Sequence, residues 1–195
     1  MIELLVAIFV IVTGIVAVLA LSIITITAAR ESIMQVEAVN LAREGIEVVR
    51  SIRDSNWLSI QAGELSADNW DDGLYLLTDY EAVSEFYPVD DPDTSEIDAG
   101  KWELNYDAAA EDQRLKILTD GTYVHFQYTV GEPTGYYRNI ITLPICEDES
   151  VISSGACSDS GQEKIGIKVT STVTWQEPNR TNTTAVEEDI YNWRP

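Results

Sequence analysis

The feature that most constrains the fold of this chain is an N-terminal run without charge. No Asp, Glu, Lys or Arg occurs between Leu4 and Ala29, and from Leu4 to Leu21 only Thr13 and Gly14 interrupt the apolar residues. As a helix that rises about 1.5 Å per residue, Leu4–Leu21 reaches about 27 Å, close to the hydrocarbon thickness of a bilayer. We expect this surface to be buried in lipid or among other copies of the chain.

A cleaved secretory signal is the alternative explanation of this run. Thr27-Ala28-Ala29 would serve as a small-residue cleavage site. Secretory signals begin with basic residues, however, whereas here no Lys or Arg precedes the apolar run and an acid, Glu3, stands at its start. We therefore favour a retained helix. Glu3 is either a first-turn acid at the headgroup level, favoured by the helix dipole, or a carboxylate that awaits a cationic partner.

The helical period continues beyond the membrane-length part. One apolar stripe recurs at steps of three and four residues: Ala38, Leu41, Ala42, Gly45, Ile46, Val49 and Ile52. The opposite face carries Asn40, Arg43, Glu47, Arg50 and Asp54, where pairs of opposite charge can form. The sequence predicts a helix over residues 1–55, with an apolar half at 1–29 and an amphipathic half at 30–55.

After residue 55 the apolar period changes from helical to alternating. Residues 124–130 and 165–175 alternate apolar and polar side chains, which predicts half-buried strands. Asp120-Gly121 predicts a hairpin that follows a strand at 115–118. Further strands are expected at 136–144 and, more weakly, near 186–193, with a turn at 177–184 between the last two.

These elements predict an α+β protein. A long N-terminal helix packs against an antiparallel sheet of four to six strands arranged as a meander. Residues 56–195 form the globular head, and residues 56–100 within it are expected to be an acidic connection with at most short elements.

The charge is concentrated in this head. The chain has 12 Lys and Arg against 33 Asp and Glu, a net charge of −21, of which residues 1–55 carry four basic and six acidic residues. The head therefore carries about −19, and such a surface repels nucleic-acid phosphates. We expect no nucleic-acid partner.

Three features of the head are candidate sites. Cys146 and Cys157 are the only cysteines, and in an exported chain they predict a disulfide, while free thiols or half a metal site are the alternatives. Asp68–Gly73 and Asp90–Asp93 have oxygen ligands and turns that calcium could use, but neither has EF-hand spacing, so calcium is a weak expectation and no other cofactor is expected. Asn179 and Asn182 begin glycosylation sequons, which we expect to be unused.

The sequence contains little that points to catalysis. The single histidine, His125, has no nucleophile motif nearby, and the chain has no P-loop, dinucleotide fingerprint or G-x-S-x-G motif. We expect a protein that is not an enzyme.

The first eight residues carry a family resemblance. Met1-Ile2-Glu3-Leu4-Leu5-Val6-Ala7-Ile8 resembles the run that opens mature type IV pilins and type II secretion pseudopilins, particularly bacterial minor-pilin-like members. Gly14-Ile15-Val16-Ala17 and the polar sequel with Arg30-Glu31 suit the same family. The printed sequence departs from the family in two respects, because neither a basic leader ending in Gly nor two residues of the usual opening stand before Met1. We expect either a leader-bearing start upstream or a truncated or mis-started mature form.

The resemblance implies a mechanism of assembly. Glu3 would be the assembly glutamate that pairs with the N-terminal amine of a neighbouring subunit, and Met1 would stand near a methylated N-terminus. The subunit would rest in the inner (cytoplasmic) membrane, meet the assembly machinery there, and then join copies of itself or related pilins in an extracellular surface filament, or fimbrium, with a role in adhesion.

Three functions remain open at this point. The first is a pilus subunit, which we favour, and the second is a secretion pseudopilin. The third is a membrane-anchored domain that binds a carbohydrate or receptor, for which the candidates are the tryptophans at 57, 70, 102, 175 and 193. A simple anchor, however, requires neither Glu3 nor a long amphipathic continuation.

Overall fold

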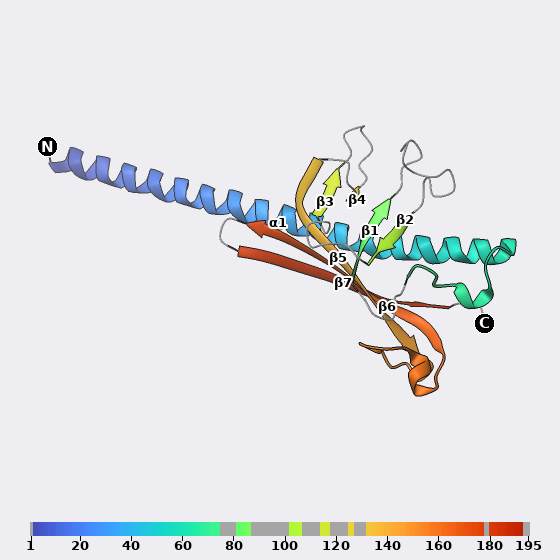
Figure 1. The fold of residues 1–195 in the computed structure, drawn as a ribbon. Helices are drawn as coiled ribbons and strands as arrows, with labels where there is room; N and C mark the ends of the chain where they lie inside the picture. The colour runs from blue at the N-terminus through green and yellow to red at the C-terminus, as the bar shows by residue number, and fades with distance from the viewer. Residues whose placement is uncertain are drawn as a thin grey trace. The chain divides into compact units, whose positions relative to one another are not determined.

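A computed structural model describes residues 2–74, 81–86, 102–106, 114–117, 125–126, 132–177 and 180–192. These residues form one long helix, two short 3-10 helices and seven strands (Figure 1). By its internal contacts the chain divides into two units, Met1–Glu37 and Ala38–Pro195. The first unit is helix, and the second combines the rest of that helix with the sheet, which is the expected α+β fold class.

Helix α1 runs without a break from Ile2 to Ala62. Its interior contains no proline and two glycines, Gly14 and Gly45, so little opposes helix formation. The helix continues beyond residue 55, where its end was expected, because residues 56–62 contain no helix breaker and Trp57 is buried in the core. It ends at Gly63, which has φ +79° and donates its N–H to the carbonyl of Ile60.

The strands of the head are β1 (Glu81–Phe86), β2 (Trp102–Asn105), β3 (Arg114–Ile117), β4 (His125–Phe126), β5 (Glu132–Cys146), β6 (Lys164–Glu177) and β7 (Arg180–Tyr191). Strands β5, β6 and β7 form an antiparallel meander, in which Tyr136 is opposite Trp175 and Thr174 is opposite Thr183. On the other edge of β5, β3 pairs near its start and β1 near its middle, while β2 and β4 extend the sheet outward.

This sheet corrects three expectations. It has seven strands among the described residues, not four to six, and two of them precede residue 106. The meander holds only for the last three strands, because β1 and β3 pair with β5 in addition to β2 and β4, their neighbours in sequence. The expected turn at 177–184 is wrong, since β7 begins at Arg180. Its polar start has no apolar alternation, so only cross-strand pairing with β6 identifies it as a strand. The expected hairpin at Asp120-Gly121 lies outside the described residues.

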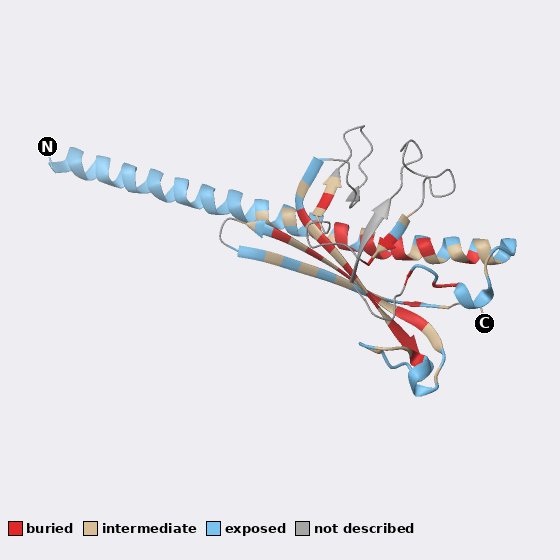
Figure 2. Cartoon of the chain, in the orientation of Figure 1, coloured by how far each residue is buried: buried red, intermediate tan, exposed pale blue. Residues whose placement is uncertain are grey.

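The core of the head lies between α1 and the sheet (Figure 2). Every member of the predicted helical stripe is buried, from Ala38 to Ile52, which confirms that prediction. The stripe packs on apolar side chains of the strands, namely Ile140, Ile167, Val169 and Ile190. Each buried aliphatic side chain of this kind stabilises the fold by roughly 1.5–3 kcal/mol.

Candidate functional site

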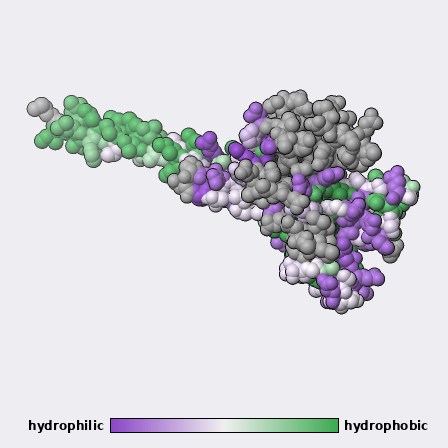
Figure 3. All heavy atoms as spheres, in the orientation of Figure 1, coloured by the Kyte–Doolittle hydropathy of each residue, from purple (hydrophilic) through white to green (hydrophobic). Residues whose placement is uncertain are grey.

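The candidate assembly segment is residues 2–37 of α1. Apart from the half-buried Met34, its large apolar side chains are between 50% and 80% exposed, and no residue of its most apolar eighteen-residue stretch is buried. Figure 3 shows these apolar side chains along the segment. By length and composition, α1 can cross a membrane. Continuous apolar surface of this extent indicates an interaction with lipid or with protein.

The threonine hydroxyl groups of the segment donate hydrogen bonds within the helix. Thr13 Oγ1 donates to the carbonyl of Phe9 at 2.9 Å, and Thr27 Oγ1 donates to the carbonyl of Ile23 at 2.9 Å. A polar group without a partner is costly in an apolar medium, and these bonds remove that cost. The segment can therefore enter lipid or a helix bundle without external partners for its threonine hydroxyls.

A shallow groove crosses the segment at Gly14. It is lined by Val10, Ile11, Ile15 and Val18, and a Cβ added at Gly14 would meet no atom within 4 Å. The missing side chain leaves room in which the backbone of another helix could approach closely.

Glu3 lies in the first turn of α1 and is exposed. Among the described residues it has no hydrogen-bond or ion-pair partner. Met1, the other residue expected to act in assembly, lies outside the described residues, so its pairing with Glu3 of a neighbour stays a prediction. The described residues that follow it, from Leu4 to Ala29, carry no cationic side chain.

In the second half of α1, a buried arginine of the sheet contacts the helix. Arg138 of β5 is fully buried, and its Nη1 donates to the carbonyl of Leu41 at 3.0 Å and lies 3.4 Å from Glu44 Oε1. Burial lowers the pKa of Arg138, while the Glu44 carboxylate raises it. Because an arginine pKa starts so high, the guanidinium stays charged at neutral pH.

A second arginine joins α1 to the edge strand of the meander. Arg50 forms ion pairs with Glu188 of β7 and with Glu47 one turn earlier in the helix, the latter at 2.5 Å. The hydrogen bond to Glu188 is the main cause of the raised pKa of Arg50. The pair with Glu47 confirms the charge pairing predicted for the polar face of the helix.

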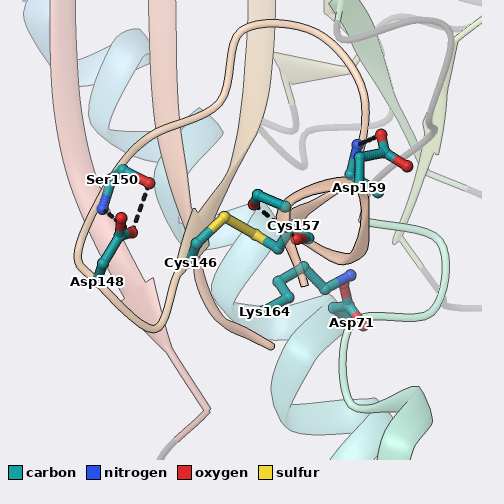
Figure 4. Close-up of a disulfide and its surroundings, with 9 residues drawn as sticks. Asp71, Cys146, Asp148, Ser150, Cys157, Asp159 and Lys164 are labelled. Carbon is teal, nitrogen blue, oxygen red and sulfur yellow. Dashed lines mark hydrogen bonds and ion pairs between the residues drawn. A yellow bond between two sulfur atoms is a disulfide. The ribbon is translucent and has the colours of Figure 1, made fainter. Parts of the chain in front are cut away.

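A disulfide closes the loop between β5 and β6. Cys146 and Cys157 are both buried, bonded to each other, and 5.5 Å apart at Cα, as expected from the sequence (Figure 4). Asp159 accepts a hydrogen bond from the backbone N–H of Ala156 at 2.8 Å. Just outside the loop, Lys164 pairs with Asp71 and so ties β6 to the segment after α1.

Asp148 in this loop has a strongly lowered pKa. Its carboxylate accepts hydrogen bonds from the hydroxyl and the backbone N–H of Ser150, the latter at 3.0 Å. The Ser150 hydroxyl is the largest influence, followed by the side chain of Gln162, and together they lower the pKa to about 2. Hydrogen bonds that favour the charged form act in this direction.

The candidate calcium residues do not converge in the structure. Within Asp68–Gly73, Asp71 is buried and pairs with Lys164, whereas Asp68 and Asp72 are exposed. The described part of the chain contains no group of three His, Cys, Asp or Glu side chains placed to hold a metal ion. The second acidic cluster, Asp90–Asp93, lies outside the described residues.

The remaining sequence candidates are dispersed. His125 lies in β4. Asn182 lies within β7 opposite Trp175, not in a turn, whereas Asn179 lies outside the described residues.

The tryptophans do not form an exposed set. Trp57, Trp70 and Trp175 are buried, Trp193 lies outside the described residues, and Trp102 is half-buried. Trp102 lines a cavity together with three serines of α1, Ser51, Ser55 and Ser59. Sequence reasoning missed this cavity, although the serines recur every four residues on one helix face. It also missed Arg138, which the alternation of β5 places on the same face as Tyr136 and Ile140.

Comparison with protein-family models, with curated proteins and with solved structures gives no match.

Proposed function

We propose that this chain is a structural subunit of a type IV pilus or a closely related filament, assembled through its N-terminal helix. One observation carries the proposal: residues 2–30 are exposed in the single chain, are apolar almost throughout, and contain Glu3 as the only acid. A helix that serves only as a membrane anchor does not require that carboxylate. An ionised side chain in an apolar segment makes insertion into the membrane less favourable.

The proposed mechanism follows from where the apolar surface can be buried. Before assembly, lipid covers residues 2–29, and the subunit is held in the membrane. On assembly, helices of neighbouring copies replace the lipid, and the groove at Gly14 leaves room for another helix to pack closely. The acidic head remains in water because its net charge disfavours burial.

Glu3 gives the assembly its register. In the apolar core of the bundle, an unpaired carboxylate is costly, and pairing with the N-terminal amine of an adjacent copy offsets much of that cost. A shift of one residue along the bundle would separate the two charges. The correct register is therefore favoured over neighbouring ones.

The test is the substitution Glu3→Gln in the native host. Membrane insertion should be unchanged or improved, because the change removes a charge from the apolar segment. Surface filaments should be lost while membrane-resident subunit persists with its disulfide formed. The matched control, Glu147→Gln, removes an exposed head carboxylate and should leave filaments intact. A normal yield of filaments from Glu3→Gln would refute the pairing mechanism.

A further inference from the structure

A cavity in the head has no role in the proposed filament. It has a volume of about 510 Å³ and lies between the end of α1, the 64–73 segment and β2. Small-molecule sites have volumes of roughly 300–1,000 Å³. The buried side chains of Ile52 and Leu104 line it together with the half-buried Trp102. The cavity thus combines an apolar lining with an aromatic side chain.

The walls of this cavity are held in place before any ligand binds. Asn56 of α1 donates from Nδ2 to the carbonyls of Trp70 and Asp72, at 3.2 and 2.8 Å, which fixes the 66–74 segment against the helix. Trp70 and Leu74 of that segment are buried in the core. On the third side, Trp102 is paired with Phe86 across β1 and β2 and packs on the core. A preformed site loses less entropy when it binds a ligand.

The polar groups at the cavity define what kind of ligand fits. Glu64, Asp72 and Glu103 contribute three exposed carboxylates, and the described lining contains no Lys, Arg or His. Carboxylates only accept hydrogen bonds, so the ligand must donate them, and an anionic ligand is repelled. A metal ion is not favoured, because no three acidic side chains in the described residues are placed to coordinate one.

We propose that this cavity binds a neutral, hydroxyl-rich saccharide. A sugar ring presents an apolar C–H face, which suits the indole of Trp102, and hydroxyl donors at its edge, which suit Glu64, Asp72 and Glu103. Neither a purely apolar ligand nor an anion satisfies both parts of the lining. The inference concerns the head alone and does not depend on the filament proposal.

The experiment uses the full chain in micelles of lauryldimethylamine oxide, a detergent without a sugar headgroup. The probes are the methyl glycosides of glucose, galactose, mannose and N-acetylglucosamine, each titrated by saturation-transfer NMR. At least one should receive saturation from the protein. Trp102→Ala should weaken its binding about tenfold or more, because the aromatic contact is lost. Asp72→Asn should weaken it about three- to tenfold, because one charged acceptor is lost.

Control variants separate binding from folding. Tyr191→Ala removes an exposed aromatic side chain of β7 that does not line the cavity, and it should leave glycoside binding unchanged. Asp72 is exposed, so Asp72→Asn keeps the test valid if Trp102→Ala fails to fold. Glu3→Gln should bind the glycoside normally, which distinguishes failure of this proposal from failure of filament assembly.

Three results would overturn the saccharide proposal. The first is that none of the four glycosides receives saturation. The second is that the transfer is the same in Trp102→Ala and Asp72→Asn as in the unmodified chain. The third is tighter binding of tetramethylammonium than of any glycoside, which would identify the cavity as a site for organic cations.

Discussion

Gly45 of α1 and Ser171 of β6 are in such close approach that a Cβ built on Gly45 would lie 2.4 Å from Ser171 Oγ. The same Cβ would lie 3.2 Å from Cδ of Arg138. All three residues are buried, so none of them can move into solvent. The glycine therefore sets how closely the helix can approach the sheet, and it leaves space for the guanidinium of Arg138 beside the carbonyl of Leu41.

Gly45→Ala should destabilise the head in spite of the higher helix propensity of alanine. Overpacking of a core costs about 1–3 kcal/mol, which exceeds the gain of about 1 kcal/mol from replacing a helical glycine. Thermal unfolding of the full chain in micelles, followed by tryptophan fluorescence, would measure the difference. Gly14→Ala is the matched control, because a Cβ there meets no atom of the chain, and it should not lower the melting temperature of the head. Equal melting temperatures for the two variants would contradict the close-contact explanation.

Glu44 and Arg138 should respond unequally to substitution. Glu44→Ala leaves the fully buried guanidinium without its carboxylate and should destabilise the head by about 1–3 kcal/mol, a value reduced because Glu44 is partly exposed. Arg138→Met replaces the charge with an apolar side chain and should change stability by less than about 1 kcal/mol.

Urea unfolding of both single variants and the double variant would check this inequality. In the double variant, the loss of stability caused by Glu44→Ala should largely disappear, because the buried charge of Arg138 is no longer present. The opposite result would be a large loss of stability in Arg138→Met and none in Glu44→Ala. It would show that the hydrogen bond from Arg138 to Leu41 stabilises the head more than the charge pair does.

The lowered pKa of Asp148 predicts a dependence of stability on pH. The folded pKa of about 2 lies below the reference value of 3.8, so the unfolded state binds more protons between these values. The stabilisation is therefore fully present above about pH 4 and is lost as the pH falls through about 2.

Carbon-detected NMR titration of the Asp148 carboxyl would measure this pKa directly. Ser150→Ala removes the largest cause of the shift, so the pKa should rise toward its ordinary value. The stability difference between the unmodified chain and Asp148→Asn should shrink toward zero near pH 2. A pKa that Ser150→Ala leaves unchanged would assign the shift to another group.

Loss of the disulfide should lower the free energy of unfolding of the head, while the sheet stays folded. Replacing Cys146 and Cys157 by alanine releases a loop of about twelve residues, for which chain entropy predicts a loss of about 2.8 kcal/mol. Hydrogen exchange should rise first in the loop, where the described contacts are local, and least in the paired centre of β6. Uniformly faster exchange throughout the sheet would mean that the bond supports the whole head.

Local periodicity was sufficient to predict the helix, its buried stripe and the strands β5 and β6. In these elements, each apolar residue from Ala38 to Ile52 and from Ile167 to Trp175 falls on one face. A helix or strand must bury such a face, whatever it packs against, so the pattern alone determines the element. The cysteine pair was predictable because a chain with two cysteines offers only one internal pairing.

The tertiary structure alone decided which segments meet. The pairing of β1 with β5 joins residues that are distant in sequence, and polar Thr181–Thr184 become a strand only because β6 lies beside them. Arg138 is tolerated in the core because Gly45 leaves it space and Leu41 and Glu44 supply acceptors. The sequence by itself determined where apolar surface must be buried, because hydrophobicity and period are properties of single segments. Contacts between distant segments depend on shape and hydrogen-bond satisfaction across the whole core, which no single segment encodes.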